Sequence, residues 1–254
     1  MVRRQNSIDA QPLLAIVRGG ITSKLYDTSL LGGLPQDQTM NSKTVKRIFI
    51  LSPANCSGLR AQLLMSERSS FALARQLRDG GASLGDIFSF MSALYFRGKL
   101  AYARSFANPP PGLPGTLIVT PGSGLRSPED ILTLGELKEI AGVKVDEHNL
   151  PYRTPLERDA RRIAESIPAG CEAVFLGSVA TSKYLGILGD AFRERLRFPA
   201  DFVGRGDMSR GGLMLRCVEK GEELTYVELA GAPRHGQRPP RLPKPNESQQ
   251  KSQP

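Results

Sequence analysis

The chain has no tryptophan, two histidines and three cysteines, and aromatic residues make up only 6% of its 254 residues. The cysteines, Cys56, Cys171 and Cys217, are far apart and form no C-x-x-C pair. Because a zinc site needs a cluster of cysteine or histidine ligands, the sequence predicts no metal site, and it predicts no other cofactor. Stacking of aromatic side chains on nucleic-acid bases is not a prominent feature of this composition.

Long apolar runs are missing as well. The chain contains no run of about 18 apolar residues, which a membrane-spanning helix requires. The apolar stretch at residues 13–17 is too short for the core of a secretory signal. Unpaired cysteines are typical of a reducing compartment. The sequence therefore predicts a cytoplasmic protein that has no membrane partner.

What the chain does contain is an excess of positive charge, with a formal net charge of +9. This charge is +2 in residues 1–44, +3 in residues 45–230 and +4 in residues 231–254. Basic segments favour contact with polyanions through the release of counterions. One prediction is therefore that the basic tails contact DNA or RNA, and the alternative is that they are solvated and have no partner.

Composition also divides the chain into three parts. Residues 1–44 lack sustained periodicity, and we predict that they are disordered or are a mis-called extension, with translation beginning at Met40. Residues 45–232 are predicted to form a single α/β domain. Residues 233–254 are basic and rich in proline and glutamine, which predicts a disordered tail.

Within the predicted domain, strands and helices alternate. Continuous apolar runs at residues 48–52, 117–120 and 173–177 are typical of buried parallel strands. Strand candidates at 200–204, 213–218 and 225–229 predict a β-rich C-terminal end. The order indicates a three-layer α/β sandwich with a largely parallel central sheet.

Helix starts are marked by capping residues and prolines. Ser83 precedes a helix whose buried face includes Ile87 and Met91, and cap-and-proline pairs predict further helix starts at Ser127 and Thr154. Tyr95 and Tyr102 could line a site, but aromatic residues on such a face are usually part of the core.

Small residues, hydroxyls and a cation follow each of the three apolar strands. The segments are residues 53–58 with Arg60, residues 121–124 with Arg126, and residues 178–183. Backbone N–H groups at a helix start, together with hydroxyls and a cation, form a receptor for anions. Ligands of open α/β sheets lie beyond the C-terminal ends of the strands, so we predict one shared crevice. The alternative is that glycine and serine are present only because turns favour them.

A fourth segment, residues 205–212, is predicted to connect the two strand candidates before and after it. Its glycines allow close approach to a ligand, and its arginines can grip phosphate or carboxylate. A long hairpin with Asp207 paired to an arginine is the alternative. The candidate phosphate- or nucleotide-binding residues of the four segments are Ser57, Arg60, Ser123, Arg126, Ser178, Thr181, Ser182, Lys183, Arg205, Ser209 and Arg210.

Three side chains are candidates for a catalytic role. Cys56 would lie at a helix N-terminus, where a thiolate is stabilised, although a free cysteine is more often part of the core. Asp207 could activate water or orient a ribose, and Asn55 could contact a base edge or a carbonyl. No spacing among these residues specifies a reaction, and the sequence leaves open whether the chain is an enzyme.

Short motifs follow one another in a distinctive order over about residues 48–216. They are Cys56, Leu94-Tyr95-Phe96, Tyr102-Ala103, Ser123-Gly124-Leu125, Pro151-Tyr152, Leu156, Leu176-Gly177 and Lys183-Tyr184. Their order resembles a family of small bacterial α/β domains of unassigned function. The architecture of that family is similar to the uracil-DNA-glycosylase-like group, and the resemblance implies a role beside nucleic-acid modification or defence systems. The glycosylase motifs, which are an activating aspartate near the first strand and a late His-Pro-Ser loop, are not recognisable in the chain. The resemblance transfers no catalytic residue, because none is established for that family.

The leading hypothesis is a nucleotide- or nucleic-acid-directed protein that binds phosphate at its strand-end loops. Its partner would be a nucleotide or another small anion, and hydrolase or glycosidase-type activity on a nucleobase derivative would extend this role. Two alternatives remain open. One is a non-catalytic nucleic-acid-binding module that uses its basic tails, and the other is an enzyme of small anionic metabolites.

Overall fold

The computed structural model describes residues 45–180, 182–229, 236–237 and 239–240. These residues belong to one compact unit, Lys43–Pro254. The N-terminal segment 1–44 and all but four residues of the predicted tail 233–254 lie outside the described residues. The predictions made for those two segments therefore stay predictions.

A six-stranded sheet forms the centre of the domain, in the order β4-β3-β1-β6-β7-β8. The four inner strands, β3, β1, β6 and β7, are parallel, and the edge strands β4 and β8 are antiparallel to their neighbours. Their bounds are β1 Arg47–Leu51, β3 Thr116–Thr120, β4 Gly124–Arg126, β6 Glu172–Leu176, β7 Leu196–Pro199 and β8 Tyr226–Glu228. The three predicted apolar strands are confirmed as β1, β3 and β6.

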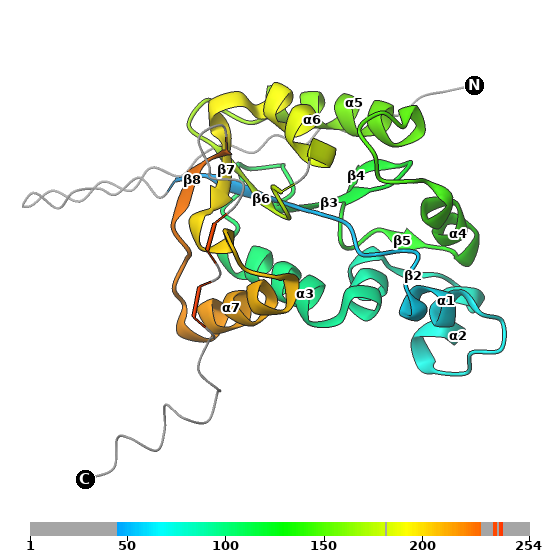
Figure 1. Cartoon of the computed structure of the whole chain (residues 1–254). Helices are drawn as coiled ribbons and strands as arrows, with labels where there is room; N and C mark the ends of the chain where they lie inside the picture. Colours follow the sequence, from blue (N-terminus) through cyan, green and yellow to red (C-terminus); the bar gives the residue numbers. More distant parts are fainter. Residues whose placement is uncertain (1–44, 181, 230–235, 238, 241–254) are drawn as a thin grey trace, which may run out of the picture. The chain divides into compact units, whose positions relative to one another are not determined.

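Helices cover both faces of this sheet. Figure 1 shows α5 (Leu150–Ser166) and α6 (Ser182–Phe192) on one face and α3 (Leu84–Phe106) and α7 (Asp207–Lys220) on the other. The predicted three-layer α/β sandwich is confirmed. Because both faces of the inner strands are covered, these strands carry apolar residues continuously, and Phe49, Ile50 and Leu51 of β1 have no exposed surface.

A smaller group of elements lies beyond the C-terminal ends of the parallel strands. It consists of α1 (Leu59–Met65), α2 (Ala72–Asp79), α4 (Leu134–Gly142) and the two-stranded pair β2 (Ala82–Ser83) and β5 (Ile131–Leu132). Figure 1 shows this group at the end of β1 that leads into α1. These helices and short strands therefore extend the domain at the end of the sheet where the parallel strands terminate.

The C-terminal part of the domain differs from the sequence prediction. The strand candidate at 225–229 is confirmed as β8, but those at 200–204 and 213–218 are wrong. A short 3-10 turn occupies Ala200–Phe202, and Asp207–Lys220 is the helix α7. The apolar run after Gly212 resembles a strand in sequence, yet it packs on α3, and tertiary packing overrides the low helix propensity of the two glycines.

A pair of glycines explains why α7 is compatible with its sequence. A Cβ atom added to Gly98 of α3 would lie 2.7 Å from the Gly211 carbonyl oxygen, and one added to Gly211 would lie 2.8 Å from the Leu94 carbonyl oxygen. The two helices therefore approach more closely than any side chain would allow. Gly211 is needed for contact between helices and not for a flexible turn.

Two predicted helix starts are also wrong. Residues 127–130 form a turn between β4 and β5, because the Pro128 and Asp130 carbonyl groups accept hydrogen bonds from Gly85 and Leu84 at the start of α3. The helix α4 begins later, where Thr133 and Glu136 form a capping box. Thr154 lies inside α5, which begins at Leu150 and has Pro151 in its first turn.

None of the helices formed by the described residues combines the length and the apolar character that crossing a membrane requires.

Candidate functional site

A cavity of about 660 Å³ lies at the C-terminal ends of β1, β3 and β6. We call it the strand-end cavity. The chain leaves β1 toward β3 on one side and later returns to β6 on the other side, so the cavity lies where the strand order reverses. Its lining comes from six parts of the chain and comprises Ser52–Ser57, Ser92, Tyr95, Pro121, residues 141–145, Ser178, Lys183, Tyr184 and Asp207.

The loop after β1 is held in place by its own polar groups. The Asn55 side-chain oxygen accepts hydrogen bonds from the Ser57 N–H at 3.0 Å and from the Ser57 hydroxyl at 2.8 Å. The Asn55 N–H donates to the Ser92 hydroxyl oxygen at 3.1 Å. Asn55 therefore orders the loop and joins it to α3.

The helix α3 is kinked where it passes the cavity. Ala93 has φ +44° and ψ −121°, which is a left-handed conformation that residues other than glycine rarely adopt. The kink separates the helix into two pieces, and Ser92 and Tyr95 on its two sides both line the cavity. The second piece of α3 therefore begins at the cavity wall.

Tyr95 has an unusual environment. Its side chain is 8% exposed, and its hydroxyl oxygen is the one buried side-chain nitrogen or oxygen atom of the described residues that has no hydrogen-bond partner. Burial raises the pKa of Tyr95 to about 12, although the nearby Arg210 guanidinium acts in the opposite direction. The hydroxyl stays protonated at neutral pH and can donate a hydrogen bond. A buried polar group without a partner is costly, and this hydroxyl belongs to a residue that lines the cavity and lies near the Arg210 guanidinium.

Lys99 lies beneath the cavity, one helical turn after Tyr95. Its ammonium group is fully buried and donates to the Ser52 carbonyl oxygen at 2.6 Å and to the Ser52 hydroxyl oxygen at 2.9 Å. It also lies 4.6 Å from the centre of the Tyr95 ring. Burial lowers the pKa of Lys99 to about 7. A lysine in an apolar helical stretch, four residues after a tyrosine, was the sequence signal for this group, and the sequence analysis missed it.

Charged side chains surround the mouth of the cavity. Lys144 and Lys183 are exposed, and Lys144 pairs with Asp146 at 3.0 Å. Asp207 begins α7, has 66% of its side chain exposed, and lies 3.6 Å from the Arg210 guanidinium. Positive groups therefore outnumber the single carboxylate, Asp207, among the described residues that line the cavity.

Several of the predicted residues meet at this cavity. Ser57, Ser178 and Lys183 line it, as do the three catalytic candidates Asn55, Cys56 and Asp207. Burial raises the pKa of Cys56 to about 12, and its thiol donates to the Ala54 carbonyl oxygen at 3.6 Å. A thiol in this state is not an activated nucleophile. Whether any of these residues binds a ligand remains a prediction.

The predicted arginines do not line the cavity, because each has a protein partner. Arg60 donates to the Phe90 carbonyl oxygen, Arg126 pairs with Asp130 at 2.9 Å, and Arg205 donates to the Asp201 carbonyl oxygen and to Ser209. The buried Arg210 donates twice to the Phe202 carbonyl oxygen, at 3.0 and 3.1 Å. These arginines stabilise turns and helix ends.

The remaining candidates have other positions. Ser182 at the start of α6 donates to the Glu147 carboxylate, and Ser123 lines a neighbouring groove. Thr181 lies outside the described residues. The predicted convergence of the first and third loops is therefore seen in the structure, whereas the second loop contributes Pro121 to the cavity instead of its serine or arginine.

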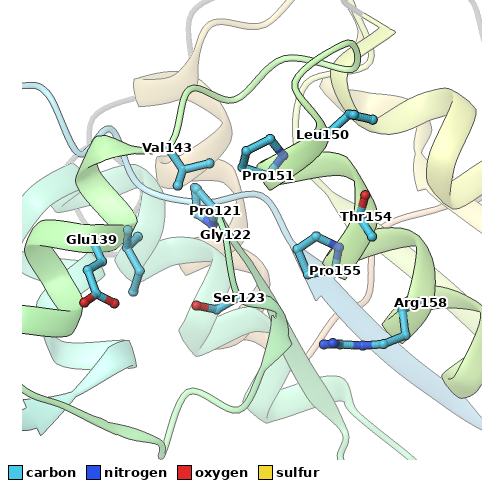
Figure 2. Close-up of a pocket in the computed structure, with 11 residues that line it drawn as sticks. Pro121, Gly122, Ser123, Glu139, Val143, Leu150, Pro151, Thr154, Pro155 and Arg158 are labelled. Carbon is cyan, nitrogen blue, oxygen red and sulfur yellow. The ribbon is translucent and has the colours of Figure 1, made fainter.

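The neighbouring groove has a volume of about 650 Å³ and lies between α4, α5 and the turn after β3 (Figure 2). We call it the side groove. It shares Pro121 and Val143 with the strand-end cavity, so the two spaces adjoin. Its lining residues are Pro121, Gly122, Ser123, Glu139, Ile140, Val143, Leu150, Pro151, Thr154, Pro155 and Arg158.

Comparison with known proteins adds no assignment. Within the described residues, no group of three or more histidine, cysteine, aspartate or glutamate side chains could hold a metal ion. No protein-family model matches the chain, and neither the curated proteins nor the solved structures with which it was compared contain a match.

Proposed function

We propose that the chain binds a small anionic molecule of the nucleotide class in the strand-end cavity. The observation that carries this proposal is the Tyr95 hydroxyl at the cavity wall, which can donate a hydrogen bond and finds no hydrogen-bond partner among the described residues. A phosphoryl oxygen of a ligand would accept that bond.

The charges around the cavity support an anionic ligand. Lys144 and Lys183 stand at the mouth, and Asp207 is the one carboxylate among the described residues that line the cavity. A phosphate group in the cavity would lie among these positive charges, which favour it over a neutral ligand.

The position of the cavity and its polar groups support a nucleotide in particular. The crevice at a reversal of strand order is where open α/β sheets bind nucleotides, although this is an analogy between folds. The Asp207 carboxylate can accept hydrogen bonds only, which suits a sugar hydroxyl, and Ser57 and Ser178 add hydroxyl groups. These groups support binding of a nucleotide, and they do not indicate a particular reaction.

The direct test is to titrate the protein with nucleoside monophosphates and to measure affinity by calorimetry. We expect Tyr95→Phe to weaken binding about tenfold, because the ligand loses a hydrogen bond to a charged acceptor. Tyr226→Phe is the matched control, since its hydroxyl bonds to Tyr102 and Glu223 away from the cavity. Equal affinity of the wild type and Tyr95→Phe would contradict the proposal.

A second candidate function, contact of the basic tail with nucleic acid, is favoured by the charge of +4 in residues 231–254. Its test is the triple substitution Arg241→Gln, Lys244→Gln and Lys251→Gln, with DNA binding measured at several salt concentrations. A tail that contacts phosphates would lose affinity and salt dependence in this variant. Nucleotide binding in the cavity would be unchanged, so the two functions can be separated.

A further inference from the structure

We infer that the side groove binds the base of the nucleotide whose phosphate lies in the strand-end cavity. This inference rests on the proposed function and deepens it, because it assigns a role to a second space. The two spaces adjoin at Pro121 and Val143, and the inference requires that one ligand reach from the first space into the second.

The walls of the side groove suit a flat ring. Figure 2 shows Val143 and Pro151 on the same side of the groove, with Pro155 and Thr154 further along α5. Proline rings and a β-branched valine have few conformations, so they present an apolar surface that loses little entropy when a ligand binds. A heterocyclic ring has two apolar faces that such walls can contact.

The floor of the side groove is the turn at Gly122, whose backbone conformation and close contact with Val143 require glycine. Gly122 has φ +77°, and a Cβ atom at this position would lie 3.0 Å from the Val143 side chain. The Ser123 N–H donates to the Thr120 carbonyl oxygen at 2.9 Å, which closes the turn. The turn after β3 therefore forms a preorganised boundary between the two spaces.

Polar groups stand where the edge of a base would lie. Glu139 of α4 and Arg158 of α5 are on opposite walls, with Ser123 between them and Thr154 on the same wall as Arg158 (Figure 2). A carboxylate accepts hydrogen bonds and a hydroxyl both donates and accepts, so these walls can contact the mixed donors and acceptors of a base edge. An apolar surface alone would fit a lipid chain, but these opposite charges favour a heterocycle with a polar edge.

The test compares ligands that have and lack a base. The probes are ribose 5-phosphate and the four common ribonucleoside monophosphates, and the measurement is calorimetric affinity for the full chain. We expect at least one monophosphate to bind ten times or more tightly than ribose 5-phosphate. Thr154→Trp, which fills the groove from an exposed position on α5, is expected to abolish that difference and to leave the affinity for ribose 5-phosphate unchanged.

A matched control and a second variant complete the design. Arg161→Trp adds the same side chain to an exposed position two turns further along α5, and it is expected to behave as the wild type. Leu150→Trp fills the groove from the start of the helix, where 67% of the leucine is exposed, and serves if Thr154→Trp does not fold.

The outcomes separate this inference from the proposed function. If ribose 5-phosphate and every monophosphate bind equally, or if filling the groove leaves their difference intact, the side groove is not the base site and the proposed function stands. If neither ribose 5-phosphate nor any monophosphate binds, the proposed function fails and this inference fails with it.

Discussion

The polar groups at the two ends of the parallel strands differ in whether they have partners within the protein. At the N-terminal ends, Arg47 pairs with Glu172 at 2.8 Å and with Glu223 at 2.6 Å, and Arg197 pairs with Glu172 at 3.0 Å. At the C-terminal ends, the Tyr95 hydroxyl has no hydrogen-bond partner among the described residues, and Lys144 and Lys183 stand at the mouth of a cavity. Groups that satisfy one another stabilise the fold, whereas groups left open near a cavity are available to a ligand.

The largest expected effect is the pH dependence that Lys99 gives to stability. Its pKa is lowered from an ordinary value of 10.5 to about 7 in the folded protein, so between these values the unfolded chain binds a proton that the folded chain does not. Folding is therefore favoured as pH rises from 7 to 10. We expect the free energy of unfolding of the wild type to rise, relative to Lys99→Met, by on the order of 4 kcal/mol over this range.

Urea denaturation at a series of pH values measures this difference. The charged groups that act on Lys99 from α7 are Asp207 and Arg210, and neither is altered in the variant. Lys144→Met is the control, because the Lys144 side chain is 80% exposed. A constant difference between the wild type and Lys99→Met from pH 7 to pH 10 would show that Lys99 keeps its proton in the fold.

At the other end of the sheet, Glu172→Ala tests whether the closed network stabilises the protein. Glu172 is 22% exposed and holds both Arg47 and Arg197. Its removal leaves two partly buried guanidinium groups with fewer partners, and we expect a loss of about 2 kcal/mol in the free energy of unfolding. Glu228→Ala removes a pair at a 57% exposed carboxylate and is expected to cost about 0.5 kcal/mol or less. Equal losses in the free energy of unfolding for Glu172→Ala and Glu228→Ala would show that the partly buried network stabilises the protein no more than an exposed ion pair does.

Two tyrosines sharpen the comparison, Tyr95 at the cavity and Tyr226, whose side chain contacts Arg47 and Glu223. Tyr226→Phe removes hydrogen bonds to Tyr102 and Glu223, so we expect a loss of about 1 kcal/mol in stability and no change in nucleotide affinity. Tyr95→Phe removes a hydroxyl that has no partner, so stability is expected to stay the same or to rise slightly. Thermal and urea unfolding of both variants measure the contrast, and a large loss of stability in Tyr95→Phe would mean that its hydroxyl is satisfied inside the fold.

The smallest expected effect is at the mouth of the cavity. Lys183 is exposed, so Lys183→Ala is expected to weaken nucleotide binding by a factor of about 3, and less at high salt. Calorimetry at low and high ionic strength measures this change. An unchanged affinity at low salt would place the ligand's phosphate away from α6.

Much of the fold could be predicted because its signals are local. The apolar runs that became β1, β3 and β6 are continuous, as strands covered on both faces must be. The parallel order then placed the loops after β1 and β6 at a common edge, which is where the cavity lies. These inferences need only the order of elements along the chain.

The rest depends on contacts between distant segments. Gly211 and Gly212 resemble a turn in sequence, and only the contact with Gly98 shows why a helix is formed there. The arginines predicted to grip a phosphate instead bind carbonyl groups such as that of Phe202, which periodicity cannot reveal. Tyr95 and Lys99 resemble core residues in sequence, because a helix kink and the loop after β1 together create their environment.

Gly98 and Gly211 allow the backbones of α3 and α7 to come into contact, so the two helices pack closely as one unit beside the cavity. Tyr95 and Asp207 are both carried by these two helices, so their backbone positions are fixed by the close contact between Gly98 and Gly211. Any change in the backbone of the cavity wall would then fall to the other lining segments, among them residues 141–145 at the end of α4.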